Sequence, residues 1–86
     1  MPVIEIYSRD LCGPCFLAKR LLEAKGVPFT EIDVGENQER IGEMVGRAGG
    51  QMTVPQIFIG GRHVGGYAEL ALLDRRGALD QLLNVS

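Results

Sequence analysis

The sequence predicts an α/β protein, a four-stranded mixed sheet with helices on both faces, in the order βαβ-α-ββ-α. Three observations favour this fold class. Two short β-rich segments flank one helical segment, which is the pattern of a parallel βαβ unit with a right-handed crossover. A second pair of short strands is joined by Gly60-Gly61, a two-residue hairpin signal. A further helical pattern follows each of these two units.

The βαβ unit opens the chain. Val3–Tyr7 and Phe29–Val34 are short and β-rich, and we interpret both as strands. Between them, apolar residues recur at near-helical spacing over Cys12–Lys25. Proline is tolerated only in the first turn of a helix, so Pro14 fixes the helix start near the cysteines. Gly26 ends this helix.

A second helix is predicted over Glu36–Ala48, where apolar residues form a stripe and glutamates occupy the N-terminal end. Gly42 and Gly46 fall inside this segment. Each glycine costs ~1 kcal/mol relative to alanine in a helix interior. We therefore expect this helix to be the weakest in the chain.

The remaining elements follow a loop that ends in an X–Pro step. Gln56–Ile59 and Arg62–Val64 are predicted strands of a hairpin. A helix is predicted over Tyr67–Arg76, where Gly77 interrupts the pattern, and Ala78–Leu83 is expected to add a final turn or two.

Composition excludes several classes of function. The chain has 86 residues, so we expect a single domain over residues 1–86. Hydrophobic residues make up 45% and charged residues 23%, a globular mixture that argues against disorder. The basic residues are scattered and the formal net charge is −2, which excludes the basic stripe that a nucleic acid partner requires.

The expected location and oligomeric state rest on the absence of sequence signals for membrane insertion, secretion and assembly. No apolar run approaches the ~20 residues that span a bilayer, so no membrane segment is expected. The first residues lack the basic and apolar segments of a secretory signal, which favours a cytoplasmic location. Nothing in the sequence indicates a stable oligomer, and we expect a monomer.

The two cysteines form a Cys12-Gly13-Pro14-Cys15 motif where the first loop becomes a helix. The first N–H groups of a helix lack partners and the helix dipole is positive there, so a thiolate at Cys12 is stabilised. Arg9 adds positive charge nearby. These features predict Cys12 as a nucleophile and Cys15, one turn inside the helix, as the resolving thiol.

Two other interpretations of the cysteines stay open. A zinc site needs four ligands, and Cys12, Cys15 and the single His63 leave one position to a carboxylate. The cysteines could instead be inert apolar residues, as a lone buried cysteine commonly is. The placement of a CxxC motif at the helix start of a βαβ unit favours redox chemistry over both. We interpret His63 as a strand or surface residue.

These motifs together resemble the glutaredoxin family of the thioredoxin superfamily over nearly the whole chain. The resemblance rests on the CxxC helix, Thr53-Val54-Pro55, and Gly65-Gly66 before a helix. Residues 53–59 and 73–77 resemble small bacterial dithiol glutaredoxins in particular. The resemblance implies a thioredoxin-like fold and a glutathione-dependent thiol–disulfide oxidoreductase that reduces disulfide-containing or glutathionylated proteins. Glutathione would be a co-substrate, with no tightly bound cofactor.

The resemblance also implies a glutathione site. The Val54-Pro55 bond would be cis and would leave the Val54 backbone free to pair with the peptide. The implied contacts are Arg9, Gln51, Thr53, Val54, Pro55, Gly66, Tyr67, Ala68 and Glu69. Glu69 would face the ligand's ammonium group. Taken without the cysteines, these segments also fit an ordinary turn and a helix whose Glu69 complements the dipole.

Three departures from the family pattern keep two alternatives open. Gly13-Pro14 replaces the usual Pro-Tyr pair and matches thioredoxin, although no tryptophan precedes Cys12. Ala68 and Gln51 replace residues that are commonly polar and basic. One alternative is a thioredoxin-like reductant served by thioredoxin reductase, whose potential would lie about 40–70 mV lower. The other is a [2Fe–2S] carrier in which two chains each supply Cys12 beside two glutathiones.

Overall fold

The computed structural model describes residues 2–84, and their elements follow the predicted order. Four strands and three helices were expected before the final turns, and each is present. The bounds are β1 Ile4–Ser8, α1 Gly13–Ala24, β2 Thr30–Asp33, η1 Gln38–Arg40, α2 Ile41–Arg47, β3 Gln56–Ile59, β4 Arg62–Gly65, α3 Tyr67–Arg75 and α4 Ala78–Leu83. No helix among these residues is long and apolar enough to cross a membrane.

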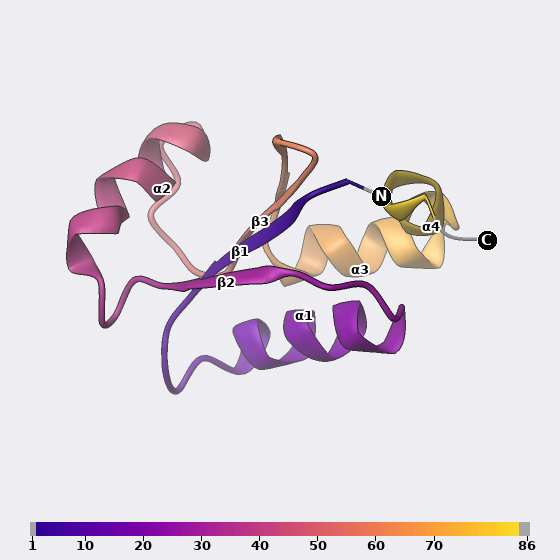
Figure 1. Cartoon of the computed structure of the whole chain (residues 1–86), viewed down its shortest axis with the longest axis horizontal. Helices are drawn as coiled ribbons and strands as arrows, with labels where there is room; N and C mark the ends of the chain where they lie inside the picture. Colours follow the sequence, from indigo (N-terminus) through magenta and orange to yellow (C-terminus); the bar gives the residue numbers. More distant parts are fainter. Residues whose placement is uncertain (1, 85–86) are drawn as a thin grey trace.

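The four strands form one mixed sheet in the order β2-β1-β3-β4. β1 pairs with β2 in parallel, whereas β1 with β3 and β3 with β4 are antiparallel. Helices cover both faces: α1 and α2 lie on opposite sides of the strands, and α3 lies on the side of α1 (Figure 1). The predicted mixed sheet is confirmed.

Alternation along the two central strands builds two cores. Ile4 and Ile6 of β1 and Ile57 of β3 face α1, α3 and α4, while Tyr7 and Phe58 face α2. Side chains of consecutive strand residues point to opposite faces, so each central strand contributes to both cores. The first core is completed by Ala18, Leu22, Val27, Ile59, Leu70, Leu79 and Leu83, and the second by Ile32, Val34, Met44 and Ala48.

The second helix is shorter than predicted. A helix was expected over Glu36–Ala48, but the structure has a single 3₁₀ turn at η1 followed by α2 at Ile41–Arg47. The Asp33 carboxylate accepts the backbone N–H groups of Gly35 and Glu36 at 2.8 and 3.1 Å. Residues 34–36 form a turn that these local bonds stabilise, and helical structure begins only at η1.

Arg47 attaches α2 to the sheet. Its guanidinium donates to both carboxylate oxygens of Glu5 at 2.8 and 3.2 Å and to the Tyr7 hydroxyl at 2.9 Å. It also lies 4.0 Å from the centroid of the Phe58 ring, a cation–π contact. The Tyr7 hydroxyl donates to Glu43. Burial, followed by this bond to a carboxylate, raises the pKa of Tyr7 above its usual value.

Candidate active site

The CxxC motif caps α1. Cys12 is the N-cap residue with extended backbone angles, and the Cys15 N–H donates to Cys12 Sγ at 3.2 Å. Pro14 lies in the first helical turn, as predicted. Cys12 and Cys15 are joined by a disulfide. The Cys12 sulfur therefore lies at the positive end of the α1 dipole and accepts one of its first N–H groups.

The two sulfurs differ in access. Cys15 is 1% exposed and belongs to the interior, whereas Cys12 is half-buried at the surface. An incoming disulfide therefore reaches Cys12 and not Cys15. This difference is the one that a nucleophile and a resolving thiol require.

The loop before β3 faces Cys12. The Val54-Pro55 peptide bond is cis, as the resemblance implied, and the Val54 carbonyl oxygen lies 3.8 Å from Cys12 Sγ. Within residues 2–84 the Val54 N–H donates no backbone hydrogen bond. An extended peptide lying along this loop can therefore pair with the backbone at Val54, as a strand pairs with a sheet edge.

A cleft of about 300 Å³ runs from this loop to the start of α3. Eight of the nine residues that the resemblance implied line this cleft, and Arg9 does not. The lining residues are Gln51, Thr53, Val54, Pro55, Gly66, Tyr67, Ala68 and Glu69, together with Pro14 and Gln56. Arg9 lines a separate hollow of about 400 Å³ with Cys12, Phe16, Lys19 and Glu31. The structure thus brings the other implied residues together in this cleft and places Arg9 in the hollow that Cys12 also lines.

Glu69 caps α3 within this cleft. Its Oε1 accepts the backbone N–H of Gly66 at 2.7 Å, which satisfies a donor at the helix N-terminus. Gly65 has a φ of +118°, and a Cβ there would lie 2.8 Å from Glu69 Oε1. Glycine at this position thus permits both the left-handed backbone and the close approach of the carboxylate. Glu69 therefore caps α3, a contact that was not predicted from the sequence, and its exposed carboxylate also lines the cleft.

Sequence reasoning missed Gln56 as part of the site. Gln56 is 1% exposed, and its Nε2 donates to the Thr53 carbonyl at 3.0 Å and to Gln51 Oε1 at 3.1 Å. Its Oε1 lies 2.6 Å from His63 Nε2. His63 is half-buried on β4 beside Phe58, where it was expected only as a strand or surface residue. A polar residue directly after Pro55 in an otherwise apolar strand was the available signal.

Glu31 lies beside the cysteines in the Arg9 hollow. Its Oε2 accepts from Lys19 Nζ at 2.8 Å and from the buried Ser8 hydroxyl at 2.6 Å. The bond from the Lys19 ammonium and that from Ser8 lower the pKa of Glu31 below its usual value. The hollow therefore carries a carboxylate that stays ionised at neutral pH.

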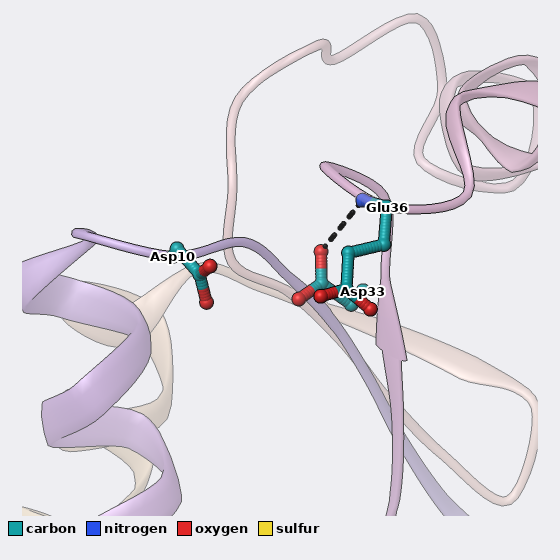
Figure 2. Close-up of side chains that lie close together, drawn as sticks. All are labelled: Asp10, Asp33 and Glu36. Atoms are coloured by element: carbon teal, nitrogen blue, oxygen red, sulfur yellow. Dashed lines mark hydrogen bonds between the residues drawn. The ribbon is translucent and has the colours of Figure 1, made fainter.

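The structure does not support the zinc alternative. Among residues 2–84, the cluster of metal-ligand types consists of Asp10, Asp33 and Glu36, whose ligand atoms lie within 4.8 Å of one another. Figure 2 shows the Asp33 carboxylate bonded to the Glu36 backbone, with Asp10 on the neighbouring loop. This cluster contains neither cysteine nor His63, and Asp10 and Glu36 are exposed. Exposed carboxylates commonly gather without a metal ion.

Comparisons with known proteins agree with these features. The family model for glutaredoxin matches residues 4–64. Glutaredoxin 3 of Escherichia coli is 47% identical over 83 residues, covering 96% of this chain and 99% of that protein. A glutaredoxin of Pseudomonas aeruginosa is 46% identical over 84 residues, covering 98% of this chain and 99% of that protein.

Solved structures share the fold. The solution structure of a glutaredoxin from Brucella melitensis has a TM-score of 0.83 at 47% identity, covering 96% of this chain and 89% of that chain. The crystal structure of a buckwheat glutaredoxin–glutathione complex has a TM-score of 0.87 at 28% identity, covering 96% of this chain and 77% of that chain. These matches confirm the expected thioredoxin-like fold. The chain belongs to the glutaredoxin family and is a glutathione-dependent thiol–disulfide oxidoreductase.

Proposed function

We propose that Cys12 is the nucleophile in the removal of glutathione from protein mixed disulfides. The Cys12 thiolate attacks the glutathione sulfur, forms a Cys12–glutathione disulfide and releases the protein thiolate. A second glutathione thiolate then attacks the glutathione sulfur on Cys12. This step releases oxidised glutathione and restores the Cys12 thiolate. The greater exposure of Cys12 and its place at the N-terminus of α1 support this order of events.

Cys15 takes part when the substrate is a protein disulfide. Cys12 attacks one substrate sulfur and displaces the other as a thiolate. Cys15, as a thiolate, then attacks Cys12 Sγ, releases the second substrate thiolate and forms the Cys12–Cys15 disulfide. Two glutathione thiolates return the pair to the reduced form and leave as oxidised glutathione. The disulfide between these two residues, with Cys15 buried behind Cys12, supports this role.

The cleft beside Cys12 is the proposed glutathione site. The Val54 backbone would pair with the backbone of glutathione, which aims the glutathione sulfur at Cys12. The γ-glutamyl carboxylate would accept N–H groups at the start of α3, and Glu69 would face its ammonium group. Support comes from the unpaired Val54 N–H, from the cleft lining, and from the glutathione complex of the buckwheat relative. Arg9 and Gln51 are the candidates for the glycyl end: Gln51 lines this cleft, and Arg9 lines the hollow that it shares with Cys12.

The observation that carries this proposal is the joint position of Cys12 and Val54, whose sulfur and carbonyl oxygen lie 3.8 Å apart. The test is reduction of a glutathionylated peptide, with glutathione and glutathione reductase recycling the enzyme. Cys15→Ser should retain this activity, and Cys12→Ser should abolish it. A requirement for Cys15 would contradict the proposed roles.

A parallel assay replaces glutathione and its reductase with thioredoxin reductase. We expect turnover with glutathione, because the cleft lining follows the glutaredoxin pattern although the motif contains Gly13-Pro14. Turnover only with thioredoxin reductase would instead show that this dipeptide decides the electron donor.

We further propose that residues 1–86 act as one catalytic domain, a monomer in the cytoplasm with no tightly bound cofactor. A reducing compartment keeps glutathione available as a thiol, which the catalytic cycle requires. Reconstitution with iron, sulfide and glutathione tests the cluster-carrier alternative. A colourless monomer is the expected product, and a brown dimer would favour a shared [2Fe–2S] cluster.

A further inference from the structure

We propose that Gln56 and His63 are positioning residues that fix the Thr53-Val54 edge for glutathione, an inference that rests on the proposed glutathione site. A chain of side-chain bonds runs from β4 through β3 to this edge. His63 Nε2 lies 2.6 Å from Gln56 Oε1, and Gln56 Nε2 lies 3.0 Å from the Thr53 carbonyl oxygen. Val54 is the next residue along the chain, and Pro55 then leads into β3.

The hydrogen-bond partners fix the direction of every bond in this chain. The Thr53 carbonyl can only accept, so the Gln56 atom beside it must be the amide nitrogen. The Gln56 carbonyl oxygen therefore faces His63, and His63 must donate from Nε2.

Packing restricts both side chains of this hydrogen-bonded chain, because Gln56 is buried and His63 is half-buried. Gln56 is 1% exposed, and the His63 ring lies 5.0 Å from the Phe58 ring, centroid to centroid. A buried amide that loses a partner leaves a polar group unsatisfied, which opposes rotation of Gln56. Backbone pairing between β3 and β4 is irregular near Gln56, because the register shifts between Ile57 and Phe58. Side-chain bonds therefore supply a connection between β4 and the loop.

The bonds of Gln56 and His63 should affect glutathione binding more than the reaction at Cys12. Thr53 is exposed and lies outside the strands, yet its carbonyl and its hydroxyl both accept from Gln56 Nε2, at 3.0 and 3.3 Å. Gln56 also bonds to Gln51 at 3.1 Å, so one amide holds two residues of the cleft wall. Loss of the His63 donor should loosen this wall and misplace the Val54 N–H. Cys12 has no hydrogen bond to Gln56 or His63 in the described chain.

The test compares two substitutions of His63 that separate its donor from its ring. His63→Phe keeps an aromatic ring against Phe58 and removes the donor, whereas His63→Gln keeps a side-chain N–H donor and removes the ring. Arg62→Ala, at the exposed neighbour on β4, is the matched control. For each protein, kcat and KM are measured with a glutathionylated peptide, and the order parameter of the Val54 N–H is measured by NMR relaxation without glutathione.

We expect His63→Phe to raise KM about threefold to tenfold, the equilibrium effect of one lost hydrogen bond, with kcat changed less than twofold. The order parameter of its Val54 N–H should be lower than in the unsubstituted protein, and His63→Gln should restore both values. Equal KM and equal order parameters in His63→Phe and the unsubstituted protein would overturn the inference. Equal defects in both substitutions would also overturn it, because the ring and not the bond would then matter.

A second variant covers the case in which His63→Phe does not fold. Gln56→Met keeps the length of the side chain and removes all of its hydrogen bonds, so it should show the same rise in KM and the same lower order parameter at Val54. Unchanged values would contradict the inference. If the proposed function fails, the unsubstituted protein itself will show no activity with glutathione. The relaxation measurement needs no glutathione, so it still decides whether the bonds hold Val54.

Discussion

The backbone N–H of Cys15 donates to Cys12 Sγ at 3.2 Å, from the first turn of α1. This donor and the helix dipole favour the thiolate form of Cys12, so the reduced protein should react at Cys12 with a midpoint below the usual thiol pKa of about 8.5. The measurement is the rate of iodoacetamide alkylation against pH, with the modified residue identified by mass spectrometry. Buried Cys15 should react more slowly.

Cys15→Ser provides the control for this measurement, because serine retains the backbone N–H that faces Cys12. Its alkylation midpoint should match that of the unsubstituted protein. A midpoint at or above about 8.5, or faster modification of Cys15, would show that the helix terminus does not activate Cys12.

Glu69 is expected to have two separable roles. It accepts the Gly66 N–H at 2.7 Å, and its carboxylate lines the proposed glutathione cleft. Glu69→Gln keeps an acceptor for Gly66 and removes the charge, so KM for a glutathionylated peptide should rise, with a smaller loss of stability than in Glu69→Ala. Glu69→Ala removes both, and it should also lower the free energy of unfolding by about 1 kcal/mol.

Urea unfolding and steady-state kinetics on the same preparations check the two effects. Equal KM values in Glu69→Gln and the unsubstituted protein would exclude the charge from binding. Equal stability in Glu69→Ala would exclude the capping role.

Much of the fold was accessible from sequence because periodicity reports local structure. The β-rich composition of β1 and the apolar spacing of α1 predicted their positions to within a few residues. The predicted start of α2 was wrong, because residues 34–36 form a turn in which the Asp33 carboxylate accepts backbone N–H groups. The apolar periodicity of the helix gives no sign of a cap that precedes it.

In the active site too, features set by short motifs were predicted, and features set by tertiary packing were not. Cys12 and the loop at Val54 were evident from short motifs, since each motif has a fixed local geometry. The link between Gln56 and His63 was missed because it depends on the β3–β4 register, which contains a shift. Arg9 lies in a different hollow because the direction of its loop depends on packing and not on proximity in sequence.

Two glycine substitutions should change stability in opposite directions. A Cβ at Gly42 in α2 would meet no atom within 4 Å, so Gly42→Ala should raise the free energy of unfolding by ~0.5–1 kcal/mol. A Cβ at Gly65 would lie 2.8 Å from Glu69 Oε1 at a φ of +118°, so Gly65→Ala should lower it by at least about 1 kcal/mol.

Urea unfolding of the two variants beside the unsubstituted protein provides the comparison. Gly65→Ala should also raise KM for glutathionylated peptide, because Glu69 must move, whereas Gly42 lies in α2 on the other face of the sheet. A stabilising Gly65→Ala would contradict the described backbone at this position, and a destabilising Gly42→Ala would contradict the open space beside α2.

The ion pair of Glu31 and Lys19 predicts a pH-dependent contribution to stability. Because Lys19 and Ser8 lower the pKa of Glu31 in the folded protein, folding favours its ionised form. The contribution is therefore complete above the unfolded pKa of about 4.3 and disappears as the pH falls through the lower folded value. Glu31 is partly exposed, with 38% of its side chain accessible, so solvent screening keeps the contribution below about 1 kcal/mol.

Glu31→Gln removes this charge and retains an acceptor for the Ser8 hydroxyl. The stability difference between the unsubstituted protein and Glu31→Gln should be largest at neutral pH and shrink below about pH 4.3, as followed by urea unfolding at several pH values. Added salt should reduce the difference at neutral pH. Glu23→Gln, at an exposed carboxylate of α1, is the matched control and should show no such trend. A difference that is constant with pH would mean that the Glu31 charge does not stabilise the folded state.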